Sequence, residues 1–412
     1  MTKAAFLFNE PEASDMDLSA PENGNPGAGG TALCFAYVIK SLDADPDSEI
    51  KVYAMQDTKL SCRSIMRVKD EAEAFADAEK NGYRVFILRG HQKPEVISEL
   101  EKHDLKYIFW MHNRLTYEEI CFFRNCEKVR RVLAVGREMY DFYIDDNVSD
   151  KLDYVTNPFI PSPEMKAIEL SGEKGICYVG SLIPDKNFHL LAEAWPQIKK
   201  EVPDAALHVI GNGKLYDRDA HLGPYGLAES EYEASFMKYL TDDEGNIDKD
   251  VIFHGIMGSE KTDVFRKCAV GVINPMGTET FGLAAVEMEA CGLPVVSRMK
   301  LGLPDAVISG KTGILIRKPS ELAGALILLL TDEARRKKLS LNARKFASEA
   351  FLPDKAAEGF KRVIGEAEND IPAAYKKPVA NMGNNNKRVR RIFHGLHKAV
   401  KKLPSVHDIQ KK

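Results

Sequence analysis

Short apolar runs alternate with helical stretches along most of the chain, and this alternation limits the possible folds more than any other feature. Stretches 31–41, 71–81 and 94–102 have helical periodicity and lie between apolar runs. Strands that alternate with helices form a parallel sheet covered by helices. The strands predicted in the first half are 4–8, 50–55, 83–88, 105–111 and 132–135.

A second series of the same kind follows the proline-rich stretch 157–163. Its predicted strands are 175–179, 206–210, 251–253, 270–273, 294–296 and 313–316. The fold class is therefore α/β, with two consecutive doubly wound parallel-sheet domains and a cleft between them. The predicted parts are a first domain (1–160), a second domain (161–352), a terminal helix that packs back toward the first domain (353–375) and a basic helical tail (376–412).

Composition excludes several other classes of protein. The 412 residues are enough for two to three domains, and 44% hydrophobic with 29% charged residues is ordinary for a globular chain. No apolar run approaches the roughly 18 residues that cross a bilayer. The seven cysteines include no C-x-x-C pair, which indicates reduced thiols and a cytoplasmic location.

The tail differs from the rest of the chain in charge. Residues 376–412 contain 11 Lys and Arg residues and one acid, whereas residues 1–375 have a balance of −14. A helix is predicted from Lys387, capped by Asn386 and ended by Pro404. Its apolar residues share one face: Val389, Ile392, Phe393, Leu396, Val400 and Leu403. Its cations are Lys387, Arg388, Arg390, Arg391, Lys398, Lys401 and Lys402.

Such a helix can lie on an anionic membrane with its apolar face in the headgroup boundary. We therefore expect residues 387–403 to hold the protein at the inner face of a membrane. The alternative is that the apolar face packs on the acidic body. Nucleic acid is disfavoured, because the body is acidic and Phe393 is the tail's one aromatic residue apart from histidines.

Two loops could approach a phosphate. The glycine-rich stretch 25–31, with Gly29 and Gly30, precedes a helix, where backbone N–H groups can bind an anion. A dinucleotide fingerprint needs a strand directly before its first glycine, and here the strand ends near Phe8, so NAD is disfavoured. Lys186 follows a predicted strand and could offset the charge of a pyrophosphate. A flexible loop and an exposed turn lysine are the alternatives.

Three Asp-x-Asp pairs could indicate a divalent metal: Asp15/Asp17, Asp43/Asp45 and Asp217/Asp219. None directly follows an apolar strand, and all lie in loop-like sequence. We therefore expect solvated turns and no metal. His112 lies at the carboxyl end of a predicted strand, where ligands of open α/β sheets bind, although a lone histidine is often structural.

The stretch from Glu279 to Glu287 is the most informative part of the sequence. Glu279 would lie in the loop after a strand, and Glu287 about two turns into the next helix. Carboxylates accept hydrogen bonds from vicinal hydroxyls, so one could face a sugar and the other a ribose. Two surface glutamates are the alternative, which the apolar residues between them disfavour.

This segment resembles the E-x7-E motif of glycosyltransferase family 4, whose members are retaining enzymes of the GT-B fold with two Rossmann-like domains. The resemblance runs through 279–296 and extends to 178–186, 208–213, 251–255 and 310–315. It is strong from 175 to about 363. The first half agrees only through 29–31, His112 and 157–159.

The resemblance implies a role for each matched residue. Glu287 would bind the ribose and Glu279 the donor sugar, while Lys186 would neutralise the pyrophosphate and His112 would contact the sugar. The remaining donor-binding residues would be Gly29, Gly30, Ser181, Phe281, Gly282 and Leu283. Ser181 departs from the family, which usually has arginine there, a bidentate phosphate ligand that serine cannot replace.

The resemblance therefore predicts a metal-independent retaining glycosyltransferase without a cofactor. It would move a sugar from a nucleotide-sugar donor to a hydroxyl of a glycan or lipid-linked acceptor. A nucleotide-sugar epimerase on the same fold is an alternative that the E-x7-E pattern disfavours. A non-catalytic partner subunit is another, suggested by Ser181 and opposed by Glu279, Glu287 and Lys186.

Overall fold

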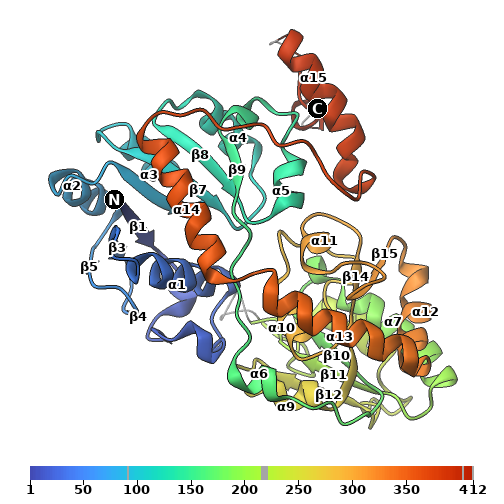
Figure 1. Cartoon of the computed structure of the whole chain (residues 1–412). Coiled ribbons are helices and arrows are strands. Elements are labelled where there is room, and N and C mark those ends of the chain that lie inside the picture. The colour runs from blue at the N-terminus through green and yellow to red at the C-terminus, as the bar shows by residue number, and fades with distance from the viewer. Residues whose placement is uncertain (91, 215–220, 401–402, 411–412) are drawn as a thin grey trace. The chain divides into compact units, whose positions relative to one another are not determined.

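The computed structural model describes residues 1–90, 92–214, 221–400 and 403–410. The chain divides into two compact units. Unit 1 consists of Met1–Pro21, Ala28–Pro158 and Phe351–Lys412, and unit 2 of Glu22–Gly27 and Phe159–Ala350. The chain thus begins and ends in unit 1 (Figure 1).

Unit 1 is built on a parallel sheet that has seven strands within the described residues, in the order β5-β3-β1-β6-β7-β8-β9. The strands are β1 (Thr2–Phe8), β3 (Ser48–Ala54), β5 (Ile65–Arg67), β6 (Val85–Arg89), β7 (Lys106–Met111), β8 (Val129–Ala134) and β9 (Leu152–Tyr154). Two short strands, β2 (Asp17–Leu18) and β4 (Lys59–Leu60), pair separately. The central strands are apolar on both faces because helices cover both faces.

The helices of unit 1 come from both ends of the chain. They are α1 (Gly30–Asp43), α2 (Glu71–Lys80), α3 (Pro94–Leu100), α4 (Tyr117–Asn125), α5 (Arg137–Phe142), α14 (Pro353–Glu368), α15 (Lys387–Ala399) and α16 (Val406–Gln410). Helix α14 packs on α1 and on strands β1 and β7 (Figure 1). Its Phe360 is fully buried, with its ring 6.1 Å from Phe6 and 4.8 Å from Trp110.

Unit 2 has a parallel sheet of six strands within the described residues, in the order β12-β11-β10-β13-β14-β15. The strands are β10 (Gly175–Val179), β11 (Ala206–Ile210), β12 (Val251–Gly255), β13 (Cys268–Val272), β14 (Val295–Arg298) and β15 (Gly313–Ile316). Its helices are α6 (Pro163–Ala167), α7 (Phe188–Glu201), α8 (Ser230–Met237), α9 (Lys261–Arg266), α10 (Leu283–Ala290), α11 (Leu303–Ala306), α12 (Leu322–Thr331) and α13 (Glu333–Glu349).

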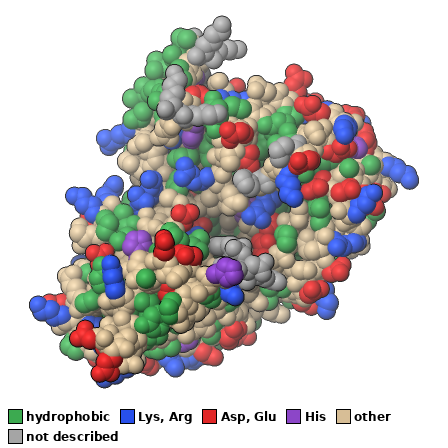
Figure 2. Space-filling model, turned by 180° about the vertical axis from the view of Figure 1, so that it is seen from behind, with side chains coloured by type: hydrophobic (Ala, Val, Ile, Leu, Met, Phe, Trp, Pro, Cys, Tyr) green, Lys and Arg blue, Asp and Glu red, His purple; other side chains and the backbone are tan. Residues whose placement is uncertain are grey.

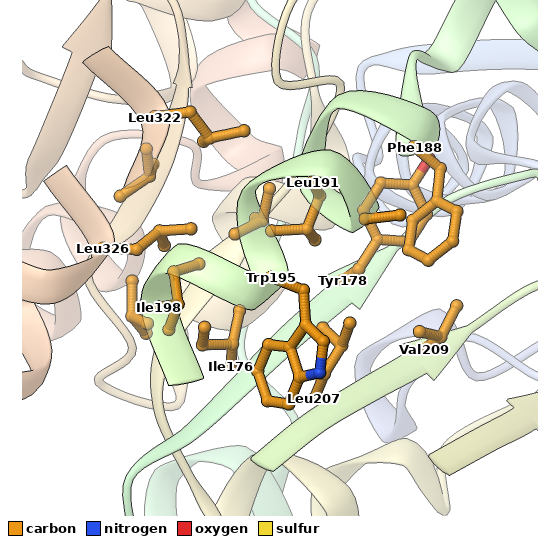
Figure 3. Packing of buried hydrophobic residues seen from close by; sticks show 14 of the residues in the cluster. Ile176, Tyr178, Phe188, Leu191, Trp195, Ile198, Leu207, Val209, Leu322 and Leu326 are labelled. Carbon is orange, nitrogen blue, oxygen red and sulfur yellow. The ribbon is translucent and has the colours of Figure 1, made fainter. Parts of the chain in front are cut away.

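The apolar face of α7 is central to the core of unit 2. Figure 3 shows Leu191, Trp195 and Ile198 of this helix between strand residues and the leucines of α12. The buried indole of Trp195 satisfies its one polar atom by donating from Nε1 to Asp248 Oδ2 at 3.0 Å. This packing holds strand β10 in place, and the loop that carries Lys186 follows that strand.

Two local features differ from the sequence-based expectation. The edge strands β5 and β9 are not in the predicted set, because each has only three residues and includes a charged side chain. Residues 22–27 belong to unit 2, where Gly24 packs near Ser162 and Ser259. Within the described residues, no helix is long and apolar enough to cross a membrane.

The tail forms a helix, with two corrections. Asn386 does not cap it through its side chain, since its backbone is left-handed (φ 56°) and a capping side chain needs an extended backbone there. The helix also ends at Ala399, before Pro404, because Val400 is extended. Lys401 and Lys402 lie outside the described residues.

Candidate functional site

Three polar side chains meet at the carboxyl edge of the unit 2 sheet, in and beside the loop after β13. Two of them, Lys186 and Glu279, are predicted site residues, and the third is Asn274. Lys186 Nζ donates to Glu279 Oε2 at 2.8 Å, and Asn274 Nδ2 donates to the same oxygen at 2.7 Å. The side chains of Lys186 and Glu279 are 15% and 26% exposed. Ligands of parallel α/β sheets bind at this edge. A cation and a carboxylate are thus held next to each other within reach of solvent.

Close backbone approach explains how the two loops meet. A Cβ on Gly277 would lie 2.4 Å from the carbonyl oxygen of Asp185, so only glycine allows the β13 loop to reach the Lys186 loop. The backbone N–H of Gly302 donates to Glu279 O at 2.9 Å and holds the other side of the loop. The position of Glu279 is therefore fixed by backbone packing.

Gly282 connects this loop to α10. Its backbone has φ 108°, which favours glycine, and it is the residue directly before the helix that starts at Leu283. Phe281 is buried beside it and anchors the turn. The N-terminus of α10 therefore follows the Glu279 loop, and a helix N-terminus favours negative charge.

Glu287 lies in a different setting from Glu279. Its Oε2 accepts from Lys261 Nζ at 2.8 Å, and both side chains are 6% exposed. Lys261, the first residue of α9, was not among the predicted site residues. Its position at the start of a helix gives no motif, so the pairing with Glu287 is visible only in the structure.

Ser181 is almost fully buried. Its hydroxyl donates to the Asn212 carbonyl oxygen at 3.1 Å, and the Tyr178 hydroxyl donates to the Ser181 carbonyl oxygen at 3.3 Å. The position therefore has its own internal partners. Its donor-binding role remains a prediction, and the phosphate charge that the family's arginine would offset needs another cation.

Arg298, at the end of β14, is a cation beside the β13 loop and was not among the predicted site residues. Its Nη1 donates to the Met276 carbonyl oxygen at 2.5 Å, in the same loop that carries Glu279. Burial lowers its pKa, and among the described residues no carboxylate forms an ion pair with it. The rule that ligands bind at the carboxyl ends of strands could have singled out Arg298.

Unit 1 has its own cluster at the carboxyl edge of adjacent strands β1, β6 and β7. Arg89 Nη1 donates to Glu10 Oε2 at 2.7 Å. Burial, opposed by Arg89 and reinforced by Glu12, raises the pKa of Glu10 to about 9. Neither Glu10 nor Arg89 was predicted, although both lie at the ends of predicted strands.

His112 follows β7 directly and is 7% exposed. Its ring packs on Trp110 at 4.4 Å and on Phe35 at 5.9 Å between centroids. Burial, and then the Arg89 charge, lowers the pKa of His112 well below its usual value. The imidazole is therefore neutral near pH 7 and offers hydrogen bonds rather than charge.

The predicted glycines begin α1. Gly29 is the residue before the helix and Gly30 its first residue. A Cβ on Gly29 would lie 3.0 Å from Glu12 Oε1, so the loop runs close to the acidic side chains near β1. Gly29 and Gly30 thus belong to unit 1, apart from Lys186 and Glu279 in unit 2.

The described residues contain no group of three or more His, Cys, Asp or Glu side chains that could hold a metal ion. Asp217 and Asp219 lie outside the described residues. Independence from metal remains a prediction.

Comparisons with known proteins agree with this architecture. Residues 163–346 match the family described as "Glycosyl transferases group 1". An uncharacterized glycosyltransferase, MJ1178, of Methanocaldococcus jannaschii is 29% identical over 46% of this chain and 47% of its own length. A GDP-mannose-dependent alpha-(1-6)-phosphatidylinositol monomannoside mannosyltransferase of Mycolicibacterium smegmatis is 26% identical over 47% of this chain and 49% of its own length.

Solved structures extend the likeness in fold to most of the chain. The structure of Anabaena Alr3699/HepE in complex with UDP-glucose has a TM-score of 0.65 and 15% identity, and covers 89% of this chain and 100% of that one. The predicted α/β architecture with two parallel sheets, the GT-B fold, is confirmed. In sequence, the chain spans about half the length of the curated relatives named above.

Proposed function

We propose that the protein, whose residues 163–346 match the family described as "Glycosyl transferases group 1", is a retaining glycosyltransferase. It moves a sugar from a nucleotide-sugar donor to a hydroxyl of a glycan or lipid-linked acceptor, without a metal. The observation that carries this proposal is the Lys186–Glu279–Asn274 cluster at the carboxyl edge of the unit 2 sheet.

The donor's pyrophosphate carries negative charge, and two cations at this edge can offset it. Lys186 and Arg298 both contact the β13 loop, the first through Glu279 and the second through Met276. We assign to Arg298 the phosphate contact that arginine at position 181 would make in the family. An arginine can bind phosphate through two parallel hydrogen bonds.

The two glutamates would bind hydroxyl groups. Glu279 is partly exposed and accepts hydrogen bonds from hydroxyl groups of the donor sugar. Glu287 Oε2 is bonded to Lys261, so a ribose hydroxyl would be accepted at Oε1. His112, being neutral, would hydrogen-bond a sugar hydroxyl.

The chemical step proposed here is the one that the resemblance to retaining glycosyltransferases implies. The bond from the anomeric carbon to the diphosphate oxygen breaks, and a bond to the acceptor oxygen forms on the same face of the sugar. The departing diphosphate takes the acceptor's proton, so the chain needs no nucleophile. Stabilising the developing charge on the leaving group is the main contribution of Lys186, Arg298 and the α10 N-terminus.

Relatives support this choice of substrates. The Mycolicibacterium smegmatis relative is named a GDP-mannose-dependent alpha-(1-6)-phosphatidylinositol monomannoside mannosyltransferase, and the Anabaena structure is a complex with UDP-glucose. Both are nucleotide-sugar proteins, and the first has a lipid acceptor. We therefore propose the same classes of donor and acceptor here.

A two-step experiment tests the proposal. Nucleotide sugars are first screened by thermal shift, since a ligand at 100 times its Kd stabilises by about 2.7 kcal/mol. Stabilising donors are then tested for sugar transfer and for hydrolysis. Stabilisation without turnover would favour the non-catalytic subunit, and stabilisation by no nucleotide sugar would contradict the proposal.

The assignment of Arg298 has its own test. Arg298→Ala should weaken donor binding by about tenfold or more, because a hydrogen bond to a charged group is worth about 1.5–3 kcal/mol. Arg335→Ala, which changes a half-exposed arginine on α13, is the matched control. Equal donor affinities for the two variants would remove Arg298 from the site.

A further inference from the structure

Helix α15 is attached to unit 1 through its charged face. Lys387 is fully buried, and its Nζ lies 2.5 Å from Glu138 Oε1 and 2.9 Å from Asp141 Oδ2. Both acids belong to α5. A lysine buried against two carboxylates fixes the start of α15, because removing the lysine would leave the buried Glu138 carboxylate without its cation.

The next turns of α15 are held in the same way. Arg390 Nη1 donates to Asp145 Oδ1 at 2.6 Å, and its guanidinium lies 4.4 Å from the centre of the Phe142 ring. His394 Nδ1 lies 2.7 Å from the Ile144 carbonyl oxygen. Asp145 Oδ2 also accepts from the backbone N–H of Val406, so one carboxylate holds both the helix and the segment after it.

This attachment turns the apolar face of the helix outward. Lys387, Arg390 and His394 are spaced by three and four residues and share the attached face. Val389, Ile392 and Leu396 start two residues after Lys387, which is about 200° around the helix, and Val400 follows directly after the end of the helix. Their exposed fractions are 46%, 63%, 47% and 51%. Figure 2 shows hydrophobic side chains gathered over α15 at the top of the view.

We propose that this apolar face of α15 docks on an anionic membrane surface. The sequence left open whether the face would pack on the acidic body, and the structure shows the charged face there instead. Arg388 and Arg391 are exposed beside the apolar residues. Residues 376–407 contain no acid, so the charge around the face complements anionic lipid.

The shape and charge of this face fit lipid better than a protein partner. It is a single convex helix, which a bilayer accepts without a preformed groove. A symmetric pair of copies in contact along this face would bring Arg388 and Arg391 near their counterparts with no acid between them. Like charges in contact oppose such a pair.

Internal pairing also changes the expected strength of the attraction. Lys387 and Arg390, two of the seven cations predicted to face lipid, instead form ion pairs with acids of unit 1. The apolar residues therefore contribute a larger share of the membrane-binding free energy than the sequence implies. Salt should accordingly weaken the binding less. This inference is independent of the proposed sugar transfer, because it concerns a different surface and its assay needs no donor.

Vesicle co-sedimentation of the full chain tests the proposal. The vesicles contain phosphatidylcholine alone or phosphatidylcholine with phosphatidylglycerol. Wild-type protein should sediment with the anionic vesicles. The double variant Ile392→Glu/Leu396→Glu should lose about tenfold or more of that partitioning, because burial of two large aliphatic side chains exceeds the 1.4 kcal/mol equivalent to tenfold.

Leu341→Glu is the matched control, since Leu341 is a 71% exposed leucine on α13 of unit 2. It should bind vesicles like the wild type, and all variants should have similar melting temperatures. Equal partitioning of the double variant and wild type, or no partitioning of wild type, would overturn the proposal. A wild-type dimer that becomes monomeric in the double variant, with no vesicle binding, would assign the face to a second copy instead.

Discussion

The carboxyl edges of the two sheets carry similar side chains in different surroundings. In unit 2, Glu279 and Glu287 each lie 2.8 Å from a lysine ammonium. In unit 1, Glu10 has an arginine at 2.7 Å, yet burial raises its pKa to about 9, and His112 is neutral as well. The unit 2 edge presents cations and paired carboxylates, while the unit 1 edge holds a neutral acid and a neutral imidazole beside the Arg89 guanidinium.

The difference shows that topology places polar groups at an edge, whereas burial and neighbouring charges decide their state. The unit 2 edge suits a charged diphosphate, because Lys186 and Arg298 are both at hand. The unit 1 edge suits an uncharged hydroxyl.

The largest effect is expected for the more buried of the two lysine–glutamate pairs in unit 2. Lys261→Met leaves the Glu287 carboxylate buried without its partner, which should lower the free energy of unfolding by about 3–5 kcal/mol in urea titrations. Lys186→Met is the comparison, and it should cost about 1 kcal/mol or less because its pair is partly exposed. Similar losses of unfolding free energy in the two variants would show that burial does not distinguish the two ion pairs.

Glu279→Gln should act on turnover rather than stability. A carboxylate that accepts hydroxyls of the donor sugar contributes about 1.5–3 kcal/mol, so kcat/KM should fall about tenfold or more. The melting temperature should stay near that of the wild type. An unchanged kcat/KM would remove Glu279 from the site.

Glu10→Gln should change how stability depends on pH. Because the pKa of Glu10 is raised from 4.5 to about 9, the folded state keeps a proton that the unfolded chain releases. The stabilisation is fully present below about pH 4.5 and is lost as the pH rises toward 9. The variant should therefore gain stability relative to the wild type as the pH rises, measured by urea unfolding. Glu127→Gln, at an exposed position, is the control, and a gain toward low pH would contradict this account.

The smallest effect is expected for chelation. Turnover measured with EDTA should equal turnover without it, since Lys186 and Arg298 supply the positive charge at the unit 2 edge. Loss of turnover that manganese restores would show that a metal supplies that charge instead.

Much of this arrangement could be predicted from the sequence. The alternation of apolar runs located all six strands of unit 2, because central parallel strands are continuous apolar segments. Edge strands β5 and β9 were not predicted, because each is short and contains a charged residue. The motif around Glu279 identified the β13 loop, because its glycines and apolar residues are contiguous in the chain.

Pairings between distant residues could not be predicted in the same way. Lys261 lies 26 residues from Glu287, and Lys387 lies 249 residues from Glu138. No local pattern marks such partners, since only the packing of helices brings them together. The tail illustrates this limit, because its periodicity defined the two faces of α15 but not which face would be buried.

The return of the chain to unit 1 has a consequence for the order of folding during synthesis. Domains generally fold as units while the chain emerges from the ribosome. Unit 2 ends at Ala350 and is fully synthesised before α14, whose Phe360 fills the core of unit 1 beside Phe6 and Trp110. The core of unit 1 can therefore close only after unit 2 has been synthesised, because Phe360 is translated after Ala350.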